Sequence, residues 1–245
     1  VEAEDRPHKR PGGYCTSLPE WDESRIFMTF TGAPSDVSTL AHELGHAFHS
    51  DVLKDEPYLH QRYAMNVAET ASTFAETIID NATINQARSD EEKVMLLGAK
   101  LETATAMFLN IHARFLFEDA FYTERADGIV SQERLNELME KAQRKAYGES
   151  LASYHPSFWS SKLHFFIDSV PFYNFPYTFG YLFSLGIYAE YVKNPTAFEE
   201  KYIALLKDTG AMEVEALAKK HLNVDITQQN FWQAGIDLMV ADVEE

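Results

Sequence analysis

The chain has 245 residues, with 21 lysines and arginines against 38 aspartates and glutamates, so its formal net charge is −17. This charge argues against a nucleic-acid-binding protein, because neutralising phosphates takes clustered cations. Apolar residues make up 45% of the chain and aromatic residues 13%, a composition typical of a folded globular protein and not of a disordered one.

The single cysteine, Cys15, cannot form a disulfide within the chain, and we therefore expect a reducing compartment, the cytoplasm. The first residues lack the apolar core of a signal peptide and include no initiator methionine. We therefore expect the sequence to be part of a longer protein. The segment 163–192 is nearly uncharged, but it contains two prolines and is rich in Phe and Tyr. This composition favours a buried aromatic wall or ligand cleft, and no membrane partner is expected.

The first predicted element is a small β element over residues 12–32, where glycine, proline and serine surround an apolar run. The run from Ile26 to Thr31 predicts the second strand of a hairpin, and the first strand is expected near Tyr14 to Leu18. Residues 35–245 are predicted to be helical. Ser35 or Asp36 is the expected cap of the first helix, which should end near Leu53.

The later helices are predicted from hydrophobic periodicity together with capping, Pro and Gly signals. Their expected ranges are 63–86, 89–123, 132–147, 158–168, 177–192, 195–207, 214–221 and 228–241. Because no internal repeat or Gly/Ser linker divides the sequence, we expect a mainly α protein with one domain over residues 1–245 and a small β hairpin near the N-terminus.

The strongest motif is His42-Glu43-Leu44-Gly45-His46. Residues four apart share one face of a helix, so both imidazoles can bind one metal ion while Glu43 lies beside the open coordination position. Neutral imidazoles suit Zn²⁺, and a carboxylate can take a proton from a water on the metal. Gly45 destabilises a helix by about 1 kcal/mol relative to Ala, which indicates a close approach of another backbone or of a substrate. The alternative is a chance match on an ordinary helix.

A third metal ligand is needed, because catalytic zinc usually has three protein ligands and one water. The carboxylates that come directly after His46 lie too near the end of the same helix. Glu69, Glu76 and Asp80 lie on the next predicted helix, and Glu69 comes far enough after His46 for the chain to turn and pack that helix against the first. Glu69 is therefore the predicted third ligand of one Zn²⁺ ion, and Glu76 is predicted to orient a ligand histidine. Co²⁺ or Mn²⁺ could occupy the same ligands.

The segments 39–50 and 67–76 together resemble the thimet-oligopeptidase family of zinc metallopeptidases, in its oligoendopeptidase F branch. Gly12-Gly13-Tyr14-Cys15 and the predicted strand from Ile26 to Thr31 resemble the β element bordering the cleft of those enzymes. The resemblance spans most of the chain and implies a zincin-like catalytic domain. It also implies short peptide substrates and a missing N-terminal region of the same protein, which forms the other wall of a channel.

The resemblance further implies donors for the oxyanion, because family members carry a histidine and tyrosines late in the catalytic region. The matching positions are His164, Tyr173 and Tyr181, with Tyr177 as a competitor of Tyr173. Tyrosines in such an aromatic segment are more often core residues, which is the alternative for each of them.

The sequence thus predicts a zinc-dependent endopeptidase that hydrolyses internal bonds of short peptides. One Zn²⁺ on His42, His46 and Glu69 would hold a water, and Glu43 would act as general base. Two alternatives stay open. The chain could be a catalytically incompetent metal-binding fragment or interaction module, or a zinc carboxypeptidase or dipeptidase on a similar scaffold.

Overall fold

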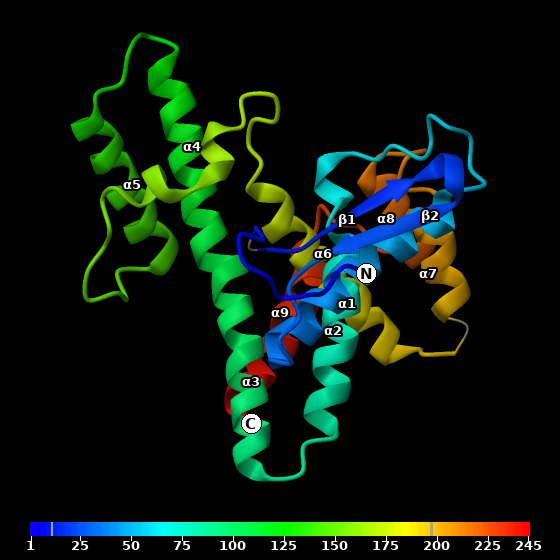
Figure 1. Cartoon of the computed structure of the whole chain (residues 1–245). Coiled ribbons are helices and arrows are strands. Elements are labelled where there is room, and N and C mark those ends of the chain that lie inside the picture. The colour runs from blue at the N-terminus through cyan, green and yellow to red at the C-terminus, as the bar shows by residue number, and fades with distance from the viewer. Residues whose placement is uncertain (11, 197) are drawn as a thin grey trace. The chain divides into compact units, whose positions relative to one another are not determined.

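The computed structural model describes residues 1–10, 12–196 and 198–245 (Figure 1). It divides into two compact units, and each is described by itself. Unit 1 comprises residues 1–101 and 180–245, and unit 2 comprises residues 102–179. The single catalytic domain expected over the whole chain therefore stays a prediction.

The fold class predicted from the sequence is confirmed, because the described residues form mostly helices and one two-stranded antiparallel sheet. The α-helices are α1 (Pro34–Leu53), α2 (Thr70–Asn85), α3 (Asp90–Thr105), α4 (Ile111–Arg125), α5 (Gln132–Tyr147), α6 (Phe175–Lys193), α7 (Phe198–Lys207), α8 (Val214–Leu222) and α9 (Gln229–Glu244). A π-helical segment, Ala106–Asn110, joins α3 to α4.

The hairpin consists of β1 (Tyr14–Leu18) and β2 (Glu23–Phe27). The second strand begins and ends earlier than the apolar run of the sequence predicts. A 3-10 turn closes the hairpin with Asp22 in a left-handed conformation, φ 49°, so pairing starts at Glu23. Beyond Phe27, the N–H groups of Met28 and Phe30 bind carbonyl groups of the N-terminal residues 2 and 3 instead of β1.

The start of α1 depends on Asp36, although the cap lies earlier than expected. Ala33 takes the N-cap position and Pro34 is the first helical residue. A proline suits this position because it has no N–H group that would need a hydrogen-bond partner. Oδ2 of Asp36 accepts hydrogen bonds from the backbone N–H groups of residues 31, 32 and 33. The acidic side chain thus fastens the incoming loop to the helix start.

Helix α2 packs side by side with α1 in unit 1 (Figure 1). The predicted helix 63–86 is interrupted at its start. A 3-10 turn covers Met65–Val67, and α2 begins only at Thr70 with Glu69 as its N-cap residue. This break directs the backbone at Glu69 differently from a continuous helix and places the residue at the end of α2 that lies beside the middle of α1.

Helix α6 contributes fully buried residues to the core of unit 1. Phe183, Leu185 and Ile187 are fully buried there, and Phe231 of α9 packs beside Gly186. A Cβ atom at Gly186 would lie 2.3 Å from the ring of Phe231, so only glycine allows the two helices to approach this closely.

Unit 2 packs α4 against α5 around four buried residues, Phe117, Leu138, Met139 and Ala142. The helix predicted at 158–168 is instead two 3-10 helices, Phe158–Ser161 and Leu163–Phe166. The hydroxyls of Ser160 and Ser161 donate to carbonyl groups three residues earlier, which competes with regular α-helical hydrogen bonding.

Among the described residues, the helical run from Asp90 to Arg125 is long and apolar enough to cross a membrane by length and composition alone. Core helices of soluble proteins also have this length and composition, so the finding is weak evidence for a membrane span. The segment 163–192 forms a 3-10 helix, a turn and most of α6.

Candidate metal centre

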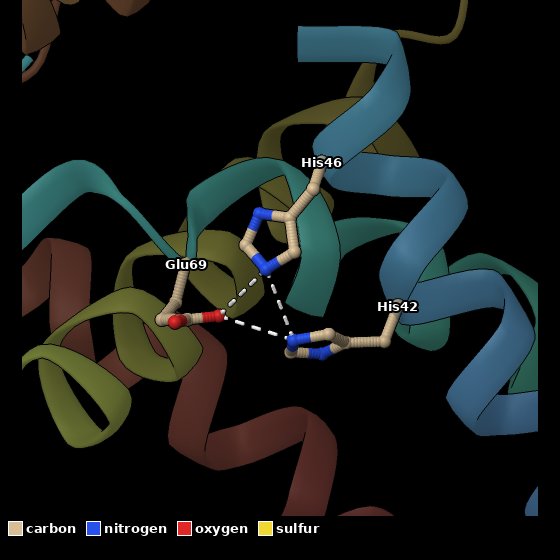
Figure 2. A group of neighbouring side chains, drawn as sticks. All are labelled: His42, His46 and Glu69. Atoms are coloured by element: carbon tan, nitrogen blue, oxygen red, sulfur yellow. Dashed lines mark hydrogen bonds and ion pairs between the residues drawn. The ribbon is translucent and has the colours of Figure 1, made fainter. Parts of the chain in front are cut away.

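The two motif histidines lie one turn apart on α1 and point in the same direction, as Figure 2 shows. Nε2 of His42 and Nε2 of His46 are 3.2 Å apart. Their rings meet edge to face with centroids 4.8 Å apart. The four-residue spacing thus brings both imidazole nitrogens to one point beside the helix.

Glu69 completes a three-atom cluster from the start of α2 (Figure 2). Its Oε2 lies 3.2 Å from Nε2 of His42 and 3.4 Å from Nε2 of His46. Ligand atoms about 2.1 Å from a tetrahedral zinc ion stand about 3.4 Å from one another, so the three atoms have the spacing that zinc requires. The donor set of two imidazoles and one carboxylate is also typical of catalytic zinc. The predicted ligands are therefore brought together.

Glu76 lies behind this cluster and accepts a hydrogen bond from Nδ1 of His42. Its predicted orienting contact with a ligand histidine is therefore present in the structure. Burial lowers the pKa of His42, but Glu69 and Glu76 outweigh burial and bring the pKa above its ordinary value. Burial raises the pKa of Glu69, and its contacts with the two histidines outweigh that effect and bring it below the usual range. The carboxylates thus make His42 a stronger base and a better metal ligand.

Three neighbours hold Glu69 in place. The hydroxyl of Ser72 lies 2.8 Å from Oε2 of Glu69, and the hydroxyl of Thr73 donates to the backbone carbonyl of Glu69 at 2.5 Å. Gly180 of α6 packs directly on the residue, since a Cβ atom at Gly180 would lie 2.6 Å from Cβ of Glu69. Ser72 and Thr73 are fully buried. The carboxylate therefore has little freedom to turn away from the histidines.

Gly45 explains how α1 and α2 come close enough to share a site. A Cβ atom at this position would lie 2.5 Å from the carbonyl oxygen of Ala71 and 2.6 Å from Cα of Ser72. The sequence predicts a close approach of another backbone or of a substrate here, and the structure shows that the backbone of α2 is the neighbour.

Glu43 is 5% exposed and lies next to the cluster on α1. Its Oε2 has no hydrogen-bond partner within the described part of the chain. Gly13 lies over the other oxygen, because a Cβ atom at Gly13 would be 3.1 Å from Oε1 of Glu43. Burial raises the pKa of Glu43, while His42 and His46 oppose this rise. A buried carboxylate with one unpaired oxygen and a raised pKa is suited to accept a proton.

His164, Tyr173 and Tyr177 form a cluster of three rings within unit 2. The ring centroid of His164 lies 5.5 Å from that of Tyr173 and 5.8 Å from that of Tyr177. The hydroxyl of Tyr177 is 3.4 Å from Nε2 of His164. Partial burial, followed by the charges of Arg114 and Lys162, lowers the pKa of His164. The neutral ring and the two phenols are hydrogen-bond donors gathered in one place, and their role stays a prediction.

Tyr181 lies in unit 1 and is 4% exposed. Its hydroxyl is 3.5 Å from the sulfur of Met239. Burial, followed by the charges of Glu76, Asp80 and Asp242, raises the pKa of Tyr181, so the phenol stays protonated. Its predicted role as an oxyanion donor stays a prediction.

The sequence alone does not identify the residues that fix the ligands and the base. In the sequence, Ser72 is notable only as a small residue near Glu69. Its position three residues after Glu69, at the start of a helix, nevertheless indicates that the two side chains can be in contact. Gly13 and Gly180 approach Glu43 and Glu69 from distant segments, and only their lack of a side chain hints at such packing.

The chain is similar in sequence to known proteins. A family model described as Peptidase family M3 matches residues 1–238. The chain is 27% identical over 233 residues to the chromosomal oligoendopeptidase F of Lactococcus lactis subsp. cremoris, covering 93% of this chain and 38% of the relative. It is 24% identical to oligopeptidase PepF of Bacillus subtilis strain 168, covering 100% of this chain and 36% of the relative. The chain thus spans less than two fifths of the length of these relatives.

Solved structures share the fold. The oligoendopeptidase F of Enterococcus faecium superimposes with a TM-score of 0.65 at 22% identity, covering 86% of this chain and 38% of that one. Pz peptidase A, solved with an inhibitor, superimposes with a TM-score of 0.79 at 18% identity, covering 97% of this chain and 42% of that one. The helical architecture around the site is therefore one that peptidases use.

Proposed function

Because the chain belongs to peptidase family M3, we propose that it is the zinc-dependent catalytic part of an oligoendopeptidase, which hydrolyses internal bonds of short peptides. The observation that carries the proposal is the cluster of His42, His46 and Glu69, whose ligand atoms all lie within 4.8 Å of one another. The buried, unpaired oxygen of Glu43 beside this cluster adds the base that hydrolysis needs.

A zinc ion bound by these three ligands would supply Lewis acidity, which polarises a carbonyl group and makes water more acidic. Glu43 then takes the proton of the attacking water on Oε2, the oxygen without a partner in the described chain, and delivers it to the leaving nitrogen. The raised pKa of Glu43 suits both steps, because the same carboxyl group must first accept and then donate a proton.

The proposal further includes donors for the oxyanion, at the positions that the family resemblance implies. Tyr173, Tyr177 and His164 carry a phenol, a second phenol and a neutral imidazole, and each can donate a hydrogen bond to developing negative charge. We assign this role to Tyr173 and His164, with Tyr177 as the competitor of Tyr173, and Tyr181 is kept as a further candidate. Removing one oxyanion donor typically lowers kcat by about 100-fold or more.

The test is cleavage of an internally quenched peptide by the intact protein, with the products identified by mass spectrometry. Zinc-loaded protein should cut internal bonds, a chelator should abolish the cleavage, and added zinc should restore it. Glu43→Gln should keep its zinc and lose at least about 100-fold in kcat, because the amide cannot accept the proton.

Three outcomes would contradict the proposal or a part of it. Release of terminal residues alone would indicate a carboxypeptidase or dipeptidase, and zinc binding without any turnover would indicate a metal-binding module. Full activity of Glu43→Gln would rule out this residue as the base. The cytoplasmic location expected from the single cysteine stays a prediction.

A further inference from the structure

Glu118 is a buried carboxylate of unit 2 that the proposed chemistry does not use. It lies on α4 and is 3% exposed. Its Oε1 accepts a hydrogen bond from the backbone N–H of Phe172 at 2.8 Å, and its Oε2 accepts one from Nδ2 of Asn174 at 3.3 Å. Burying a carboxylate is unfavourable unless hydrogen bonds compensate. These two bonds fasten the turn 171–174 to α4 at two points.

The fastened turn contains an unusual backbone conformation. Phe172 has φ 59°, in the left-handed region that bulky side chains rarely adopt. Such strain persists only where the surroundings fix the conformation, and it is concentrated at functional sites. The bond from Glu118 to the N–H of Phe172 supplies one such constraint.

The ring of Phe172 supplies a second constraint. Its centroid lies 6.0 Å from that of Phe115 and 5.1 Å from that of Tyr122, both on α4. Residues 115, 118 and 122 are three and four apart, so they lie on one face of the helix. This face of α4 therefore holds both the backbone and the side chain of Phe172.

Tyr173 lies within this turn, between Phe172 and Asn174. Both residues that flank it, Phe172 and Asn174, are hydrogen-bonded to Glu118. The ring centroid of Tyr173 lies 5.5 Å from that of His164. If Phe172 relaxed to an ordinary φ, the next peptide group would rotate and carry the ring of Tyr173 away from His164.

We propose that Glu118 is a positioning residue, which holds the turn 171–174 in its strained conformation and so keeps Tyr173 beside His164 for stabilising the oxyanion. The inference rests on the proposed function and on Tyr173 as a donor. Glu118 does not touch the reacting atoms. Its effect is on placement, and displacing a catalytic group by about 1 Å can lower a rate by about 100-fold.

The test compares two substitutions of Glu118 in the intact, zinc-loaded protein. Glu118→Leu keeps a similar volume and removes both acceptor oxygens. Glu118→Gln keeps one acceptor oxygen for the N–H of Phe172, and its amide group can donate to Oδ1 of Asn174, which has no partner in the described chain, once the side-chain amide of Asn174 flips. The matched control is Asp119→Leu, because Asp119 is the neighbouring carboxylate on α4 and is exposed.

We expect Glu118→Leu to lower kcat by at least about tenfold with KM within about twofold of the unmodified protein, because a misplaced donor affects the transition state more than substrate binding. Glu118→Gln should keep kcat within about threefold, a rescue by the conservative variant. Zinc content should be unchanged in both variants, and Asp119→Leu should match the unmodified protein. Equal kcat values in Glu118→Leu and Asp119→Leu would overturn the inference.

A double-mutant cycle with Tyr173→Phe tests whether Glu118 acts through Tyr173. Glu118→Leu should lower kcat little further once the phenol is absent, whereas full additivity would overturn the inference. If Glu118→Leu does not fold, Asn174→Ala takes its place, since it removes one of the two bonds, and an unchanged kcat there would overturn the inference.

The same experiment separates the inference from the proposed function. If the unmodified protein shows no zinc-dependent cleavage, the proposed function fails. If cleavage is present and Tyr173→Phe has no effect on kcat, the positioning role is overturned while the metal chemistry stands.

Discussion

Ser72 places its hydroxyl 2.8 Å from Oε2 of Glu69, the same carboxylate oxygen that lies 3.2 Å from Nε2 of His42. A buried hydroxyl thus fixes the oxygen that completes the ligand cluster. Partners of this kind orient a ligand and typically change metal affinity by about 10- to 100-fold when they are removed.

Replacing Ser72 with Ala should therefore weaken zinc binding by about tenfold or more while the fold is retained. The dissociation constant is measured by competition with a chromophoric chelator. Thr77→Val is the matched control, because Thr77 is also buried on α2 but donates its hydroxyl to the backbone carbonyl of Thr73. Equal zinc affinities in the two variants would show that Ser72 does not position Glu69.

Replacing Gly45 with Ala should separate α1 from α2, because the new Cβ atom would lie 2.5 Å from the carbonyl oxygen of Ala71. We expect the free energy of unfolding to fall by about 2 kcal/mol, although Ala favours a helix by about 1 kcal/mol over Gly. Zinc affinity should fall as well, since the ligands come from both helices.

The matched control for Gly45 is Gly98→Ala on α3, where a new Cβ atom would meet no described atom within 4 Å beyond the helix backbone around it. There the helix preference acts alone and should raise the free energy of unfolding by about 0.5 to 1 kcal/mol. The free energy of unfolding of each variant is measured by urea unfolding. A stabilised Gly45→Ala variant would contradict the close packing of the two helices.

The contribution of each carboxylate to metal binding should depend on which nitrogen of His42 it faces, Nε2 for Glu69 and Nδ1 for Glu76. Glu69→Ala removes a ligand and should reduce bound zinc to a small fraction of one ion per chain. Glu76→Ala removes only the partner of Nδ1 of His42 and should weaken binding by about 10- to 100-fold. Metal content after dialysis against buffered zinc distinguishes the two, and the reverse order would move the third ligand to Glu76.

The shared face of the two ligand histidines can be predicted from the sequence because it depends on helix geometry alone. His42 and His46 share a face by their spacing, and the chain between His46 and Glu69 is long enough for two helices to pack. The contacts of Ser72 and Gly180 with Glu69 depend on how α2 begins and on where α6 passes, and hydrophobic periodicity carries no information on either.

The errors in the predicted elements also come from contacts about which hydrophobic periodicity carries no information. The strand β2 ends at Phe27 because the turn at Asp22 sets the register, and the N-terminal residues 2 and 3 bind the backbone of Met28 and Phe30. The predicted helix at 158–168 breaks because the hydroxyls of Ser160 and Ser161 donate to carbonyl groups three residues earlier. Side-chain to backbone bonds of this kind override a periodic pattern.

His49 is a buried histidine one turn beyond His46, and it links α1 to the segment after α7. It is fully buried, and its ring stacks on Tyr63 with centroids 4.3 Å apart. Nε2 donates to the hydroxyl oxygen of Thr209 at 2.8 Å, since that hydroxyl itself donates to the carbonyl of Leu206. Nδ1 has no partner within the described residues. Burial lowers the pKa of His49 to about 4.

The neutral form of His49 should make the protein less stable in acid. The unfolded chain takes up the proton near pH 6.5 and the folded chain only near pH 4, so the unfolded state binds more protons between these values. The free energy of unfolding should therefore fall by about 3 kcal/mol from this group as the pH drops through this window. His49→Phe keeps the stacking on Tyr63 and should reduce the loss measured by urea unfolding at pH 7.5 and 4.5. The exposed His60, changed to Phe, is the control. A His49→Phe variant with the same pH dependence as the control would show that this histidine does not determine the acid sensitivity.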